Sequence, residues 1–141
     1  MKDACAHFQG AAWAFHTLPD RHASIEGTLL NVDYLALMSQ ISLAQAQECI
    51  LEKSILDHKK PAIIVKVAAQ IVEFYKQSNV KIEASKGNVK KAIGGDFLKT
   101  IAKYCYFKEL FYNSVANFFM GLSCEEESKW WVEFNLQKWV V

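Results

Sequence analysis

The residues best suited to chemistry in this chain are its thiols and imidazoles, and their spacing forms no catalytic or metal-binding pattern. The chain contains four cysteines and four histidines. No CxxC pair and no cysteine–histidine ligand spacing occurs among them. Cys5 and His7 are two residues apart on a predicted helix and therefore do not face each other. The sequence thus predicts no catalytic residue, no metal and no cofactor.

Phosphate-binding loops are also missing from the sequence. Neither GxxxxGK[ST] nor GxGxxG occurs, and Gly94-Gly95 indicates only a turn. Lys86, Lys90 and Lys91 form a small basic segment, which predicts either a solvated surface or a weak peripheral contact with anionic lipid. The formal net charge of +1 gives no reason to expect nucleic acid as a partner.

The composition predicts one globular domain. The chain has 141 residues, of which 52% are hydrophobic and 22% charged. Its first residues, MKDACAHFQG, do not form a signal-peptide pattern, and no apolar run reaches the ~18 residues of a membrane span. We therefore expect a cytoplasmic location with reduced thiols.

Helix-start and helix-stop signals divide the chain into five predicted helices. Asn31 is a candidate N-cap, Pro61 suits a first helical turn, and Gly121 suits a helix end. No period-two alternation predicts a strand. The expected helices span residues 2–18, 32–56, 61–77, 97–120 and 124–139, with a flexible, Lys-rich connection at 78–95. Short connections predict an all-α fold of antiparallel helical hairpins.

The predicted helix 61–77 has an unusually wide apolar arc. The centre of that arc consists of Ile64, Ala68, Ile71 and Tyr75. Ile63 and Val67 lie at its edge, where one packing contact would not usually need them. Two interpretations stay open: both side chains touch a second helix, or both line a groove for an amphipathic helix of a partner.

The stretch SLAQAQECILEK, residues 42–53, lies in the predicted helix 32–56 and has no single apolar face. Leu43, Ala46 and Ile50 point one way, whereas Leu51 and Ile55 point another. A helix with neighbours on two sides shows this pattern. The sequence therefore predicts an inner helix of a helical array.

The run AQAQECILEKSILDHKKPAIIVKVAAQIVEFYK, residues 44–76, resembles the Bro-type domain family, which includes Alix and the His-domain protein tyrosine phosphatase (HD-PTP, Myopic in insects). CAHFQGAAWAF at residues 5–15 looks like the preceding helix of that family. ECILEKS and the later MGLSCEEESKW are most similar to the HD-PTP branch. The resemblance covers most of residues 1–130, is specific at 44–76 and is weak at 78–100.

The resemblance implies the central part of a solenoid-like (TPR-like) Bro-type domain. Such domains bind the C-terminal amphipathic helix of an ESCRT-III subunit of the charged multivesicular body protein family, and the HD-PTP branch also accepts the signal-transducing adaptor molecule. On this chain the family's contact positions fall on Ile50, Ile63 and Val67. Lys66 is placed to meet acidic residues of the bound helix. The resemblance thus implies an adaptor in endosomal sorting and multivesicular body formation, located in the cytoplasm and at endosomes.

Departures from the family pattern leave a second hypothesis open. Arg21 is the only arginine, so the Cys-x5-Arg loop of a tyrosine phosphatase cannot form, and we expect no enzyme activity. A full Bro-type domain is also much longer. The alternative is a truncated or degenerate fragment that acts as a decoy or has no independent binding function. The Trp-rich tail after residue 129 predicts exposed apolar surface or a dimer contact.

Overall fold

The computed structural model describes residues 2–21 and 28–139, and the side chains of these residues up to Trp130. These described residues form five helices: α1 (Lys2–Arg21), α2 (Val32–Leu56), α3 (Pro61–Ala84), α4 (Lys86–Ile93) and α5 (Gly95–Trp139). The expected all-α fold is confirmed. The side chains of the predicted C-terminal tail after Trp130 lie outside the described residues.

Local signals set the ends of the α2–α3 hairpin. The Asn31 side chain caps α2 by accepting a hydrogen bond from the Tyr34 amide at 3.1 Å. Pro61 begins α3, where its missing amide hydrogen removes no helical bond. Between the two helices, His58 adopts a positive φ of 50° and reverses the chain. The hairpin is therefore determined largely by sequence-local chemistry.

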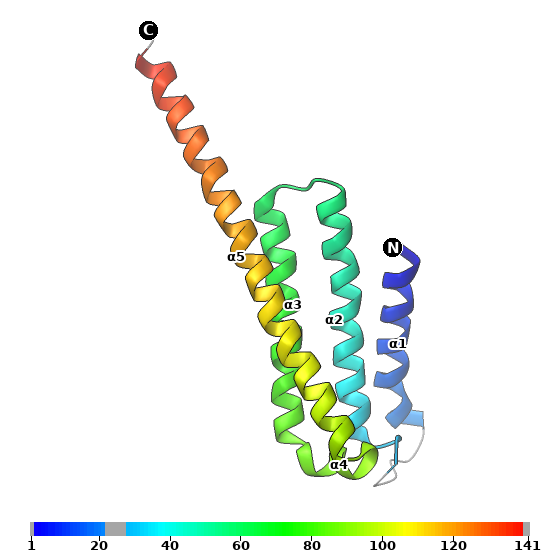
Figure 1. The fold of residues 1–141 in the computed structure, drawn as a ribbon. Coiled ribbons are helices and arrows are strands. Elements are labelled where there is room, and N and C mark those ends of the chain that lie inside the picture. Colours follow the sequence, from blue (N-terminus) through cyan, green and yellow to red (C-terminus); the bar gives the residue numbers. More distant parts are fainter. Residues whose placement is uncertain (1, 22–27, 140–141) are drawn as a thin grey trace.

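The main helices pack in chain order, so that α1 lies against α2, α2 against α3, and α3 against α5. Figure 1 shows α2 and α3 as an antiparallel pair with α5 crossing α3 and continuing past the α2–α3 turn. The core residues of α3 are those predicted: Ile64, Ala68, Ile71 and Tyr75 are all buried. They form one cluster with buried residues of α2 and α5.

The segment 78–95 differs from the expected flexible connection. The helix α3 continues to Ala84, and α4 follows almost at once. Ser78, Ile82 and Val89 are buried at helical spacing and tie this polar-looking segment to the core. Gly94, with a φ of 83°, then ends α4 in a conformation that suits glycine. The lysines of this segment cover the outer surface of two helices.

The expected break between residues 120 and 124 is also absent, because α5 runs without interruption from Gly95 to Trp139. Glycine inside a helix costs only ~1 kcal/mol, and adding residues to an existing helix is favourable once it has formed. Gly121, predicted to end one helix, and Ser123, which directly precedes the next predicted helix at 124–139, both lie within α5. The first helix likewise includes Pro19 and ends at Arg21, three residues beyond the expected end.

Candidate functional site

The inner helix α2 is packed on two sides, as predicted from its lack of one apolar face. Ala44, Ala46 and Leu51 are buried, although they point in different directions around the helix. The neighbours are α1 on one side and α3 on the other. Ser39 shows how close α1 comes, because its hydroxyl donates to the Ala12 carbonyl at 2.9 Å. Small residues thus let α2 serve as the centre of the array.

The four residues predicted to bind a partner lie on adjacent helices with different exposure. Ile63 is 46% exposed and Ile50 is 37% exposed. Val67 lies one turn after Ile63 on α3 and is half-buried against the core. Lys66 is exposed on the same helix, three residues after Ile63. This hairpin therefore presents to solvent two aliphatic side chains, part of a third aliphatic side chain and one positive charge.

The hairpin register places these residues at similar heights along α2 and α3. Gln40 of α2 donates a hydrogen bond to Gln77 of α3 at 3.0 Å. Ile50 and Val67 are each ten residues nearer the turn than that pair, so antiparallel packing sets them level with each other. We call Ile50, Ile63 and Val67 the hairpin face. Ile50 also borders a shallow hollow of about 250 Å³, shared with residues of α1 such as Cys5 and Gln9.

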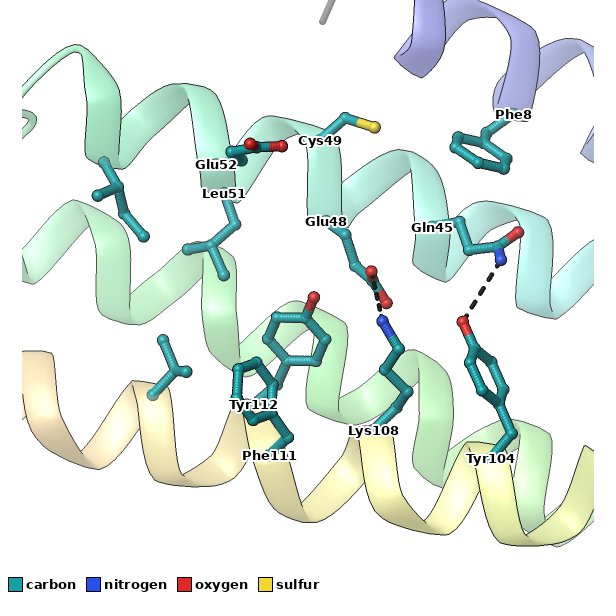
Figure 2. Close-up of a pocket in the computed structure, with 12 residues that line it drawn as sticks. Phe8, Gln45, Glu48, Cys49, Leu51, Glu52, Tyr104, Lys108, Phe111 and Tyr112 are labelled. Carbon is teal, nitrogen blue, oxygen red and sulfur yellow. Dashed lines mark hydrogen bonds and ion pairs between the residues drawn. The ribbon is translucent and has the colours of Figure 1, made fainter.

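A polar cluster joins α2 and α3 to α5 and was not foreseen from the sequence. Lys108 of α5 donates to Glu48 of α2 at 2.8 Å, and both side chains are about four-fifths buried, with 20% and 18% exposed. The other oxygen of Glu48 accepts from the hydroxyl of Tyr75 in α3. One carboxylate therefore links three helices (Figure 2 shows the ion pair).

Aromatic rings surround this ion pair. The Lys108 ammonium lies 5.4 Å from the ring centres of both Tyr104 and Tyr112. Gln45 donates to the Tyr104 hydroxyl at 3.4 Å, which adds a further link between α2 and α5 (Figure 2). These contacts hold the positive charge of Lys108 against α2 in a mostly apolar setting.

Burial shifts the pKa values of several groups at the cluster and in the core. Burial, followed by the hydrogen bond to Glu48, raises the pKa of Tyr75, and burial likewise raises that of Tyr112. Burial alone would lower the pKa of Lys108, but its hydrogen bond and charge attraction to Glu48 prevail and raise it. The lysine is thus held charged and the tyrosines neutral, which is a structural rather than a catalytic arrangement.

A cleft of about 490 Å³ opens above this cluster, between α1, α2 and α5. Phe8, Leu51 and Phe111 supply apolar walls, and Glu52 and Cys49 lie at its α2 side (Figure 2). Burial, followed by the nearby Cys5 thiol and acidic side chains, raises the pKa of Cys49. A protonated thiol is a poor nucleophile, so the cleft has the chemistry of a packing groove rather than of an active site.

Among residues 2–21 and 28–130, no group of three or more potential ligands could hold a metal ion. Within the described chain, no helix combines the length and apolar character that crossing a bilayer requires.

Arg21 lies over the Trp13 ring at 5.7 Å, on α1 and away from the α2–α5 cluster. Arg21 does not line the cleft, so it offers no guanidinium to Cys49, the thiol found there.

The sequence contained a partial signal for the cluster. Glu48 is the one charged residue between positions 34 and 51, and Tyr75 has a hydroxyl at the centre of an apolar face. If these two side chains are buried, each needs a polar partner. The identity of that partner could not be deduced, because Lys108 is 60 residues away from Glu48 in the sequence.

Comparison with known proteins places the chain in a family. The BRO1-like domain profile matches residues 1–134. Human tyrosine-protein phosphatase non-receptor type 23 is 33% identical over 129 residues, which cover 92% of this chain and 8% of the relative. The vacuolar protein-sorting protein BRO1 of Gibberella zeae is 33% identical over 129 residues, covering 92% of this chain and 12% of the relative.

A more distant relative is ALG-2 interacting protein X of Dictyostelium discoideum, 31% identical over 122 residues, which cover 78% of this chain and 15% of that protein. The chain therefore spans between 8% and 15% of the length of these relatives. The match to the phosphatase covers 8% of its length, and that same stretch of this chain matches the BRO1-like profile. The resemblance seen in the sequence is confirmed, and the chain belongs to the BRO1-like domain family.

Proposed function

We propose that this protein is a non-enzymatic adaptor module of endosomal sorting, which binds the C-terminal amphipathic helix of an ESCRT-III subunit on its hairpin face. The observation that carries the proposal is the exposure of Ile50 and Ile63 beside half-buried Val67, on the helices with the most family-specific sequence. Membership of a family that includes a vacuolar protein-sorting protein supports the same role.

The chemistry of the hairpin face fits a helix with one apolar side. Covering three aliphatic side chains yields ~1.5–3 kcal/mol each, if all were fully exposed beforehand. Ile50, Ile63 and Val67 start partly covered, and association carries its own entropic cost. Micromolar affinity, equivalent to about −8 kcal/mol, is the expected result. Lys66 is available at the rim for an acidic side chain of the partner, where it would mainly favour encounter and orientation.

Peptide titration tests this proposal. The probe is a fluorescently labelled C-terminal helix of a charged multivesicular body protein, followed by anisotropy. Ile63→Asp should weaken binding by at least ~10-fold, because the bound state would bury a carboxylate without a partner. Lys66→Glu should weaken it less, and chiefly at low salt.

The matched control is Val80→Asp, which places the same charge on an aliphatic side chain of the same helix. Val80 is 63% exposed and lies four to five turns beyond Ile63. It should bind like the unaltered protein, and circular dichroism should show equal helicity for all variants. Equal affinity of Ile63→Asp and Val80→Asp would rule out the hairpin face.

A different result would favour the decoy hypothesis. If the unaltered protein fails to bind the peptide and melts without cooperativity, the chain keeps the fold only in part and has no independent binding function. A second expected ligand is the signal-transducing adaptor molecule. Its binding segment should compete with the ESCRT-III peptide, since both are proposed to occupy the same face.

A further inference from the structure

The helix α5 carries an exposed aromatic stripe on the side opposite its core contacts. Its core side contains buried Leu98, Cys105 and Tyr112. The outer side bears large apolar side chains, each between 48% and 63% exposed: Tyr106, Phe107, Leu110, Phe111 and Phe118. Phe111 is at the edge of this side and also forms a wall of the 490 Å³ cleft. We call these five residues the α5 stripe. Phe107 and Phe111 already stack on each other, with ring centres 6.0 Å apart.

The size of the α5 stripe is that of an interface. An aromatic side chain buries 150–250 Å² when covered, so the exposed parts of these five amount to roughly 500 Å². That is near the largest patch that monomeric proteins usually expose. A stable interface takes about 800 Å² from each partner. The remainder is available from Ser114 within the stripe, and from Gly121 and the stem of Lys103 just beyond its ends, all along the same side of α5.

The residues along this side of α5 are self-complementary about Ser114. Phe107 and Gly121 lie seven residues to either side of Ser114, so an antiparallel copy sets each Phe107 opposite a Gly121. A side chain added at Gly121 would meet nothing within 4 Å, so this position is open to a ring from outside. Leu110 and Phe118 are likewise four residues to either side and meet as large apolar side chains.

Charge follows the same symmetry. Lys103 and Glu125 lie eleven residues to either side of Ser114, and both are exposed. The antiparallel arrangement therefore sets each Lys103 near a Glu125 of the second copy and closes both ends of the apolar contact with opposite charges. In a parallel dimer, the two Lys103 side chains would lie beside each other, and so would the two Glu125 side chains. Such contacts between like charges are unfavourable.

We propose that two copies of this chain pair through α5, antiparallel and centred on Ser114. The contact is isologous, as expected for a two-fold dimer. In this arrangement the later part of each α5 lies along the earlier part of the other. The later part is available for such a contact because α5 continues past the α2–α3 turn (Figure 1). The hairpin face is on α2 and α3, so pairing through α5 uses a different surface from the one proposed for the ESCRT-III helix.

Sedimentation velocity over a micromolar dilution series tests the pairing. The unaltered protein should show a concentration-dependent dimer. Phe118→Glu should raise the dimer dissociation constant at least ~10-fold, because the contact would bury an unpaired charge. Val80→Glu places the same charge on an equally exposed side chain of α3, and its dimer should be unchanged. A monomeric unaltered protein, or a dimer indifferent to Phe118→Glu, would overturn the proposal.

Disulfide trapping tests the register. In a Cys124→Ser background, which removes the exposed native thiol, Ser114→Cys should form a covalent dimer under mild oxidation. A disulfide requires Cα atoms within ~7 Å, which only residues near the two-fold axis satisfy. Ser128→Cys, on the same helix, is the control and should not cross-link. Equal cross-linking of both variants, or cross-linking of Ser128→Cys alone, would contradict an axis at Ser114.

Discussion

At the scale of single residues, the carboxylate of Glu48 joins three helices. It accepts hydrogen bonds from Tyr75 and Lys108 and thereby connects α2 to α3 and α5. Its setting differs from that of Asp57, whose ion pair with Lys53 at 2.8 Å is more than two-fifths exposed. The two pairs have equal length but unequal burial, so they should differ in how much each contributes to stability.

Replacing the lysine of each pair tests this difference. Lys108→Met should lower the free energy of unfolding by ~2 kcal/mol, because it leaves a mostly buried carboxylate without its cation. Lys53→Met should cost less than about 0.5 kcal/mol, as is usual for surface pairs. Urea denaturation followed by circular dichroism measures both. Similar losses of unfolding free energy in the two variants would show that burial does not strengthen the contribution of the Glu48–Lys108 pair to stability.

At the scale of elements, the segment 78–95 shows how a polar composition can hide a helix. Its six-residue run KGNVKK contains one apolar side chain, Val89, and that side chain is fully buried. Val89, together with the partly buried Ile93, is enough to anchor α4, because this helix has only eight residues and packs against α2, α3 and α5. The lysines thus describe only the solvent-exposed side of α4, and the composition gives no sign of its buried side.

Two glycines in this segment should respond in opposite ways to alanine. Gly87 is inside α4, and an added methyl group would meet nothing within 4 Å, so Gly87→Ala should stabilise the protein by ~0.5–1 kcal/mol. Gly94 has a φ of 83°, where a side chain is strained, so Gly94→Ala should destabilise it by ~1 kcal/mol or more. Thermal melts of the two variants provide the measurement. Stabilisation by both would be incompatible with the α4 end as described.

At the scale of the whole molecule, the core holds ionisable groups in their neutral form. Burial raises the pKa of the Cys105 thiol from 9.0 to about 12. Tyr75 and Tyr112, in the same core cluster, also have raised pKa values, for which burial is the first cause. All three groups keep their protons in the folded protein at a pH where the unfolded chain loses them.

Stability should therefore decrease at alkaline pH. Below the unfolded pKa of ~8.5 for cysteine and ~10 for tyrosine, both states are protonated and stability is full. As the pH rises above these values the unfolded chain binds fewer protons, so the free energy of unfolding falls until the folded pKa is reached. Urea titrations from pH 7 to pH 11 measure this fall. Cys105→Ala should have a shallower slope between pH 9 and pH 11, and an identical slope would contradict the role of Cys105.

Several features of this protein follow from local sequence alone. The all-α class, the beginning of α2 at Asn31 and of α3 at Pro61, and the inner face of α3 were predictable. Each depends on residues within a few turns of one another: a cap, a proline or a 3–4 spacing of apolar side chains. The family resemblance at residues 44–76 was recognisable for the same reason, since it lies in a contiguous run.

Tertiary packing decided the rest. Gly121 and Ser123 carry local signals for a helix end and a helix start, but α5 passes through both. Glu48 could not be paired with Lys108 from the sequence, because only the packing of α5 against α3 brings α5 close to α2. Whether Ile50 and Ile63 would be covered or open was likewise undetermined. The exposure of a side chain depends on which other helix packs over it. Apolar periodicity identifies the faces of a helix, but it does not determine which element packs against each face.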